Sequence, residues 1–72
     1  MPHNIGQKLS RLRGDTPRKQ VALDLGISYS ALQMYENGYR IPRDDIKVKI
    51  AKYYGKTVGE IFYAQEQHRM RN

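Results

Sequence analysis

The 72-residue sequence contains no cysteine and no tryptophan, and its apolar runs are only a few residues long. Without cysteine, no disulfide can staple the fold and no thiolate can bind a metal. The short apolar runs exclude a transmembrane helix and the core of a signal peptide. These absences fit a cytoplasmic protein that has no membrane partner.

Acidic residues are also scarce. Seven Asp and Glu stand against thirteen Lys and Arg, which gives a formal net charge of +6. A surplus of this size on one small domain favours polyanionic partners: DNA, RNA or an acidic membrane surface. Solubility alone would also account for the charge, because net charge carries no information about the fold.

What is present is apolar periodicity of the helical kind. Five segments carry it, and no segment of any length alternates as a β-strand does. Their approximate ranges are 4–13, 17–25, 29–36, 43–54 and 57–62. We therefore predict a compact all-α fold of five helices, with residues 1–63 as the folded domain and residues 64–72 as a polar, frayed C-terminal tail.

Glycine, proline and hydroxyl residues mark where the second and third helices begin and end. Thr16 followed by Pro17 predicts a cap and a first helical residue, because the missing N–H of proline costs nothing there. Gly26 ends that helix, and Ser28 is placed to cap the next one. Two short helices joined by about four residues that include a glycine are the helix-turn-helix signature.

The last two helices have their own signals. Thr57 and Glu60 have the spacing of a capping box, which predicts the start of the fifth helix. On the fourth helix, the lysines lie outside a single apolar stripe. That stripe consists of Ile46, Ile50, Tyr53 and Tyr54.

The run from Pro17 to Phe62 resembles the Cro/C1-type (XRE-like) helix-turn-helix DNA-binding domains of phage repressors and related bacterial regulators. The matching landmarks are Val21-Ala22, Gly26-Ile27-Ser28, Tyr35-Glu36-Asn37-Gly38, Pro42, Ile50-Ala51, Gly55 and Ile61-Phe62. The resemblance implies a five-helix, lambda-repressor-like domain whose second and third helices form the helix-turn-helix. It also implies double-stranded DNA as the partner, a bacterial or phage-encoded source, and no cofactor.

The third helix carries one outward face without charge. Its residues are Tyr29, Ser30, Gln33 and Met34. In the major groove, base edges present hydrogen-bond donors, acceptors and thymine methyl groups, so neutral and varied side chains suit them. The resemblance implies base contacts at these four positions. The alternative is a tolerated polar surface, with Tyr29 and Met34 packed against a neighbour.

Phosphate contacts are expected around that face. The candidates are Arg18, Lys19, Asn37, Tyr39, Arg40 and Arg43. Arg18 begins the second helix, where the resembling family often has a glutamine that contacts the backbone and braces the recognition helix. An arginine there favours a charge-assisted phosphate contact and leaves the bracing role open. Each basic residue could equally be part of a solvated surface.

One ion pair is implied by the resemblance: Arg11, near the end of the first helix, with Glu36 in the third.

Catalysis has little support, because His3 and His68 lie near opposite ends of the chain and lack companions at ligand or triad spacing. Asp44 and Asp45 diverge by about 100° on a helix and suit its N-terminal dipole. We expect no enzyme activity, no bound metal and no small-molecule ligand.

The function these features favour is a sequence-specific transcriptional regulator. The prediction is a repressor that binds an inverted repeat as a homodimer. The candidate interface residues are Phe62, Tyr63 and Val48. An antagonist protein is one expected way of regulating the repressor. The alternative is a protein-interaction module such as an antitoxin, which would bind its partner through the segment after Phe62. Non-specific RNA binding is a third interpretation, although the pattern places most tyrosines in partly buried positions or in the turn rather than on display for stacking.

Overall fold

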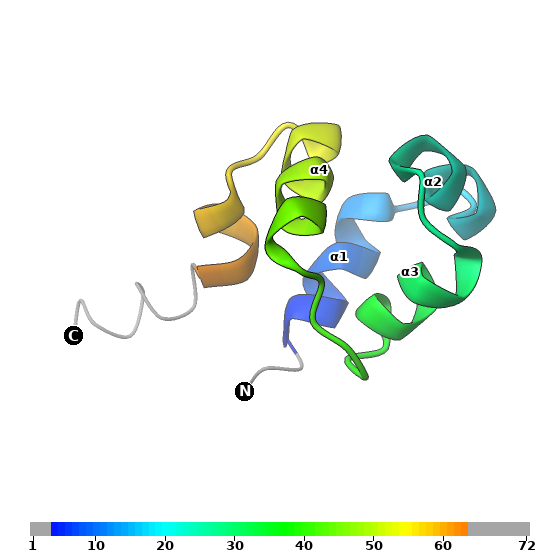
Figure 1. The fold of residues 1–72 in the computed structure, drawn as a ribbon, viewed down its shortest axis with the longest axis horizontal. Helices are drawn as coiled ribbons and strands as arrows, with labels where there is room; N and C mark the ends of the chain where they lie inside the picture. The colour runs from blue at the N-terminus through cyan, green and yellow to red at the C-terminus, as the bar shows by residue number, and fades with distance from the viewer. Residues whose placement is uncertain (1–3, 64–72) are drawn as a thin grey trace.

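The computed structural model describes residues 4–63, and these residues form four α-helices and one π-helical turn (Figure 1). The elements are α1 (Asn4–Arg13), α2 (Arg18–Leu25), α3 (Tyr29–Glu36), α4 (Asp44–Tyr54) and η1 (Gly59–Tyr63). The all-α fold predicted from the sequence is confirmed for this part of the chain. The predicted C-terminal tail, residues 64–72, lies outside the described residues.

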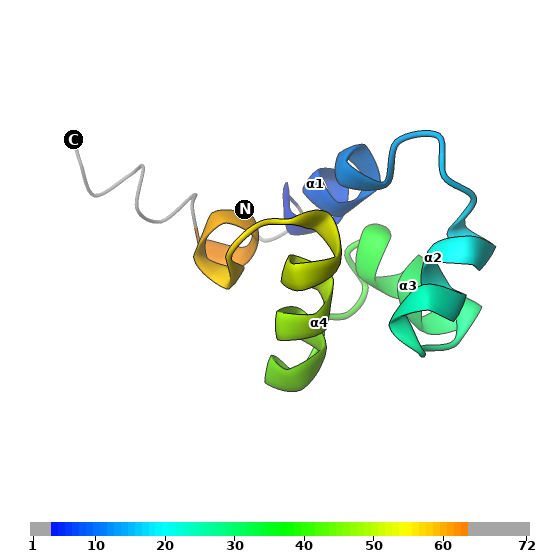
Figure 2. The ribbon, with the colours of Figure 1, turned by 90° about the horizontal axis from the view of Figure 1, so that it is seen from above.

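The helices surround one apolar core. Figures 1 and 2 show α1 and α4 in the centre, with the α2–α3 pair on one side and η1 on the other. The buried side chains are Leu9, Val21, Ala22, Leu25, Leu32, Ile50, Ala51, Ile61 and Phe62. Every described element contributes to this list, so burial of apolar area holds each short helix where propensity alone would leave it marginal.

Two details differ from the sequence predictions. Residue Pro17 is the N-cap of α2, with an extended backbone at φ −60° and ψ 140°, so the helix begins at Arg18 and Thr16 is not its cap. The side chain of Tyr53 is 38% exposed, although its spacing placed it in the apolar stripe of α4. Its hydroxyl donates a 2.7 Å hydrogen bond to Asp24, which draws the ring towards the surface.

Gly6 sets the distance between α1 and α3. A Cβ atom at this position would lie 2.9 Å from the carbonyl carbon of Glu36, and closer still to the carbonyl oxygen. It would also lie 3.0 Å from the carbonyl oxygen of Tyr35. Since real Cβ atoms do not approach backbone so closely, only glycine allows α1 to cross the end of α3 at this depth.

The start of η1 is fixed by the predicted capping box. The Thr57 N–H donates to Glu60 at 2.8 Å, and the Glu60 N–H donates to the Thr57 hydroxyl at 3.0 Å. The bond from the Thr57 backbone lowers the pKa of the Glu60 carboxyl. Lys47 of α4 covers the other side of η1: its ammonium lies 5.5 Å from the centre of the Phe62 ring and donates to the Tyr63 hydroxyl at 2.9 Å.

Candidate nucleic-acid interface

The turn between α2 and α3 is closed by backbone and side-chain hydrogen bonds. Gly26 has φ 73°, a left-handed conformation that favours glycine, and the next residue, Ile27, donates its N–H to the Ala22 carbonyl at 3.0 Å. The Ser28 hydroxyl accepts a 3.0 Å bond from the Ala31 N–H and caps α3, as predicted. These hydrogen bonds fix the backbone of the turn and, with it, the orientation of α3 relative to α2.

The four predicted base readers lie where the sequence placed them, on the part of α3 that faces away from the core. Tyr29 is 47% exposed and Met34 41%; Ser30 is exposed and Gln33 is half-buried. Within residues 4–63, the side chains of Ser30 and Gln33 make no hydrogen bond to other protein groups. Their donors and acceptors are therefore available to a ligand.

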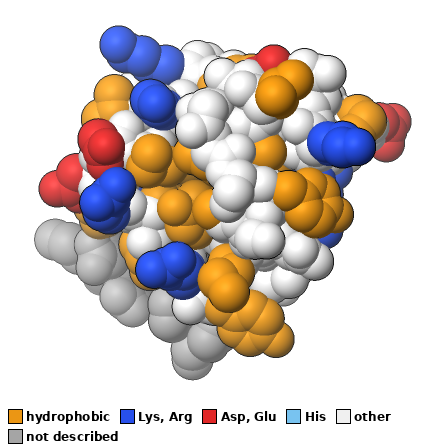
Figure 3. Space-filling view, turned by 45° about the vertical axis from the view of Figure 1, so that its right-hand side comes forward, with side chains coloured by type: hydrophobic (Ala, Val, Ile, Leu, Met, Phe, Trp, Pro, Cys, Tyr) orange, Lys and Arg blue, Asp and Glu red, His pale blue; other side chains and the backbone are white. Residues whose placement is uncertain are grey.

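Basic side chains lie around this face rather than on it. Figure 3 turns the α2–α3 side of the molecule forward: uncharged and apolar side chains fill most of the middle of the view, and separate charged side chains, both Lys/Arg and Asp/Glu, lie around them. A neutral centre with a charged margin separates two kinds of recognition, one for base edges and one for phosphates.

The loop from α3 to α4 carries most of the predicted phosphate contacts. Its residues Asn37, Tyr39, Arg40 and Arg43 are all exposed, and Tyr39 reaches 78%. Hydrogen bonds from the backbone N–H groups of Tyr39 and Arg40 to the Met34 carbonyl, at 2.9 and 3.4 Å, fold the loop back against the end of α3. The two arginines, together with Tyr35 and Ile41, line a hollow of about 230 Å³.

The N-terminus of α2 supplies the remaining two candidates. Lys19 is exposed. Arg18 is partly covered: its Nε donates to Glu36 Oε1 at 2.9 Å, and its side chain is 29% exposed. The hydrogen bond to Glu36, followed by one to Tyr29, raises the pKa of the arginine. Arg18 therefore braces α3 through Glu36.

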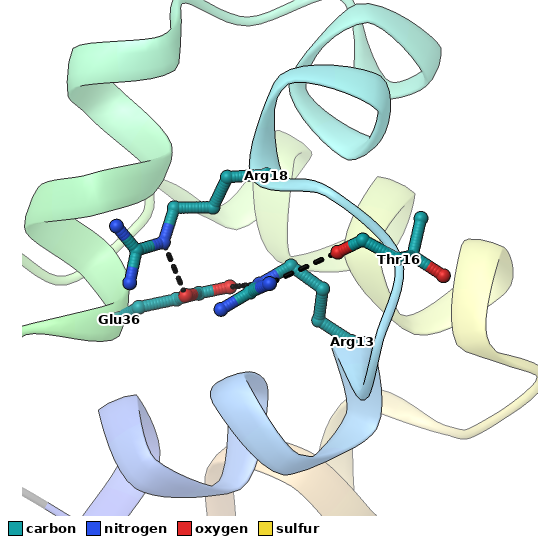
Figure 4. Close-up of polar contacts among 4 residues, drawn as sticks. All are labelled: Arg13, Thr16, Arg18 and Glu36. Atoms are coloured by element: carbon teal, nitrogen blue, oxygen red, sulfur yellow. Dashed lines mark hydrogen bonds and ion pairs between the residues drawn. The ribbon is translucent and has the colours of Figure 1, made fainter.

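The predicted pair between Arg11 and Glu36 is wrong. Glu36 binds Arg13 instead, with Nε to Oε2 at 2.8 Å, and it binds Arg18 as its second partner (Figure 4). Helix geometry explains the error, since residues two apart point about 200° from each other. Arg13 follows the buried Leu9 by four positions and shares its inner face, whereas Arg11 points outward and is exposed.

Glu36 is the centre of a three-helix cluster. Its side chain is only 1% exposed, and its two carboxylate oxygens each accept one bond, from α1 and from α2. Arg13 adds a 2.9 Å bond from its Nη1 to the Thr16 carbonyl, which fixes the α1–α2 connection (Figure 4). The cluster thus orients the helix that carries the candidate base readers.

Sequence reasoning missed Arg13 and Gly6. Both lie on the Leu9 face of α1: Arg13 follows that leucine by four residues, and Gly6 precedes it by three. This helical spacing was the signal that could have identified them.

The predicted dimer contact at Phe62 also needs correction, because Phe62 is 7% exposed and belongs to the core. Val48 and Tyr63 remain on the surface, at 44% and 42% exposure.

Among the described residues, no group of three His, Cys, Asp or Glu side chains is arranged to hold a metal ion. No helix of residues 4–63 has the length and apolar character needed to cross a membrane.

Comparison with known proteins identifies a family. A family model described as helix-turn-helix, of the Cro/C1 type, matches residues 8–61. The matched range takes in the end of α1, the whole of α2, α3 and α4, and the start of η1, so it covers well over half of the chain. No curated protein and no solved structure matches the sequence.

Proposed function

The chain belongs to the Cro/C1-type helix-turn-helix family, whose members bind double-stranded DNA, and we propose that it is a sequence-specific transcriptional repressor. In this role it acts in the cytoplasm, on nucleoid DNA. The observation that supports the proposal best is the uncharged outward face of α3, which lies between the basic N-terminus of α2 and the basic loop 37–43.

The proposed division of labour follows the chemistry of the side chains. Gln33 can make two hydrogen bonds to an adenine edge, Ser30 can reach several kinds of edge, and Met34 can contact a thymine methyl group. Tyr29, at the start of α3, is placed for a base or a phosphate. Contacts to phosphate come from the surrounding set, which consists of Arg18, Lys19, Asn37, Tyr39, Arg40 and Arg43.

A dimer on an inverted repeat completes the proposal. One copy of so small a reader spans only a few base pairs, so useful affinity requires two copies with half-site centres about 34 Å apart. The exposed Val48 and Tyr63 are the surface residues retained from the predicted interface.

Selection of bound sequences from a random DNA library, at two salt concentrations, tests this function. We expect an enriched inverted repeat and an affinity that falls steeply as salt rises, because phosphate contacts release counterions. If no motif is enriched, the base-reading role fails and a protein-interaction module such as an antitoxin becomes the better explanation.

Two substitutions test the division between base and phosphate contacts. Met34→Ala should relax the preference at one base position, by roughly 1–3 kcal/mol of discrimination. Arg40→Ala should weaken binding to all sequences alike and lower the salt dependence by about one phosphate contact. Equal effects of the two substitutions on sequence preference would contradict the assignment.

A further inference from the structure

A groove lies between the C-terminal ends of α2 and α4, and the family assignment gives it no role. Its volume is about 480 Å³. In Figure 1 these two helix ends both lie towards the top of the view, whereas loop 37–43 lies at the bottom. The groove is lined by Leu23, Asp24, Gly26, Lys49, Lys52 and Tyr53, among others.

Two exposed apolar side chains line this groove. Leu23 is 75% exposed, an unusual position for a leucine on a helix whose other aliphatic residues are buried. Tyr53 is 38% exposed, and its ring is held by the 2.7 Å bond from its hydroxyl to Asp24. The pair provides exposed apolar surface along the groove.

The charged residues that line the groove are Asp24, Lys49 and Lys52. Asp24 already accepts two hydrogen bonds from neutral donors, one from Tyr53 and one from Gln20 at 2.8 Å. Lys49 and Lys52 have no ion-pair partner within residues 4–63. The groove therefore combines two exposed apolar side chains with two lysines that lack an ion-pair partner in the described part of the chain.

The position of the groove separates it from the candidate DNA-binding surface. The N-terminus of α2 and the loop before α4 carry the candidate phosphate contacts, and the groove lies at the opposite ends of the same two helices. Lys49 is the groove residue nearest to that end of α4, and it follows Arg43 by six residues, or about 9 Å along the helix axis. A ligand in the groove would leave α3 accessible.

We propose that this groove binds an acidic protein segment in which one large apolar side chain lies close to two or more carboxylates. The apolar side chain packs on Leu23 and the Tyr53 ring, and the carboxylates pair with Lys49 and Lys52. A second copy of this chain fits less well, because a symmetric contact would bring the same lysines of two proteins of net charge +6 together. DNA fits less well because the exposed apolar side chains of Leu23 and Tyr53 make up much of the groove surface.

Peptide selection with the full chain as bait tests the proposal. A phage-displayed random peptide library is selected on the wild-type protein, and binders that also recognise the Leu23→Ser protein are removed. We expect enriched peptides that combine a large apolar residue with neighbouring Asp or Glu. Enrichment of peptides without carboxylates, or of none that distinguish the two proteins, overturns the proposal.

The strongest peptide is then synthesised and titrated into the labelled protein by NMR, with and without DNA. We expect saturable shifts at Leu23, Gly26 and Lys52, whether or not DNA is present. Shifts centred on Ser30 and Gln33 instead would identify a mimic of DNA and would overturn the proposal. The groove assignment does not depend on DNA binding, so it survives a failed DNA selection.

Substitutions at the groove give the size of the effect. Leu23→Ser should weaken the peptide at least about tenfold, the scale of one buried aliphatic side chain. Lys52→Glu should weaken it too, and added salt should reduce the difference. Ile41→Ser is the matched control, since it removes an exposed aliphatic residue that lies outside the groove; an equal loss in this variant would contradict the site. Leu23 is exposed, so the fold should tolerate its replacement, which thermal melting checks.

Discussion

The contact that holds α3 and the contact that holds η1 use similar chemical groups at very different depths. At α3, the Glu36 side chain is 1% exposed and binds two arginines from two other helices. At η1, the capping box of Thr57 and Glu60 is exposed.

This difference in depth decides how each contact responds to change. A buried charge adds little net stability compared with a well-packed apolar residue, but removal of its partner is costly because water cannot replace it. Exposed charges and caps contribute small amounts in either direction. The buried cluster of α3 is therefore sensitive to single substitutions, whereas the exposed capping box of η1 is tolerant.

The largest effect is expected for Gly6→Ala. The new methyl group would meet the backbone of Glu36, so α1 and α3 would have to separate. We expect a loss of about 3 kcal/mol or more, at the upper end of overpacking costs, even after the gain in helix propensity. Chemical denaturation measures it. Gly59→Ala is the matched control, because a Cβ there has ordinary contact distance to Thr57, and a similar loss in both variants would contradict the close crossing.

A smaller loss is expected for Glu36→Gln. The substitution strands two arginines, but their side chains are 15% and 29% exposed, so water recovers part of the cost and we expect about 2–3 kcal/mol. Thermal melting should fall more than sequence preference changes. Arg13→Gln should also lower the melting temperature, while Arg11→Gln should leave it nearly unchanged. The opposite order of the two arginine variants would restore the pair predicted from the sequence.

Thr57→Ala tests the exposed contact. It removes the hydroxyl that caps the Glu60 N–H, and we expect a loss of about 1 kcal/mol, typical of an N-cap. Denaturant titration can resolve this value. A loss as large as that of Glu36→Gln would show that depth does not separate the two contacts.

The smallest effect at neutral pH is expected for Tyr54→Phe. The Tyr54 hydroxyl is buried and has no hydrogen-bond partner among the described groups, so its removal should raise stability by about 0.5–1 kcal/mol. Burial, and then the charge of Glu36, raise the pKa of Tyr54 to about 12. An unfolded tyrosine ionises near pH 10, so wild-type stability should fall as pH rises from about 10 to about 12.

Melting curves across this alkaline range check the sign of the effect. The Phe variant should lose less stability than wild type. The decline should not vanish, because the bond to Asp24 also raises the pKa of Tyr53. An unchanged alkaline slope in the Phe variant would contradict the burial of the Tyr54 hydroxyl.

Local sequence signals predicted the helices and their ends well. Gly26, Ser28 and the Thr57–Glu60 pair act through their own backbone neighbourhood, so a few residues suffice to identify them. The cap of α2 was misplaced by one residue because Thr16 and Pro17 are both acceptable there. The neutral face of α3 was also readable, since it depends only on helical period and residue type.

Long-range partners were harder to predict. Whether Arg11 or Arg13 meets Glu36 depends on the rotation of α1, and Gly6 controls that rotation by allowing one close crossing. The burial of Phe62 depends on how η1 docks, which no local pattern specifies. These features result from packing between helices that are distant in the sequence.

The three-membered cluster also constrains the order in which this surface could change during evolution. Loss of Arg13 or Arg18 first leaves Glu36 with one partner and a balanced pair. Loss of Glu36 first leaves two guanidinium groups of like charge beside each other with no acceptor between them. Among descendants of this sequence, we therefore expect an arginine to be replaced before the glutamate, and a neutral residue at position 36 to occur together with at most one arginine.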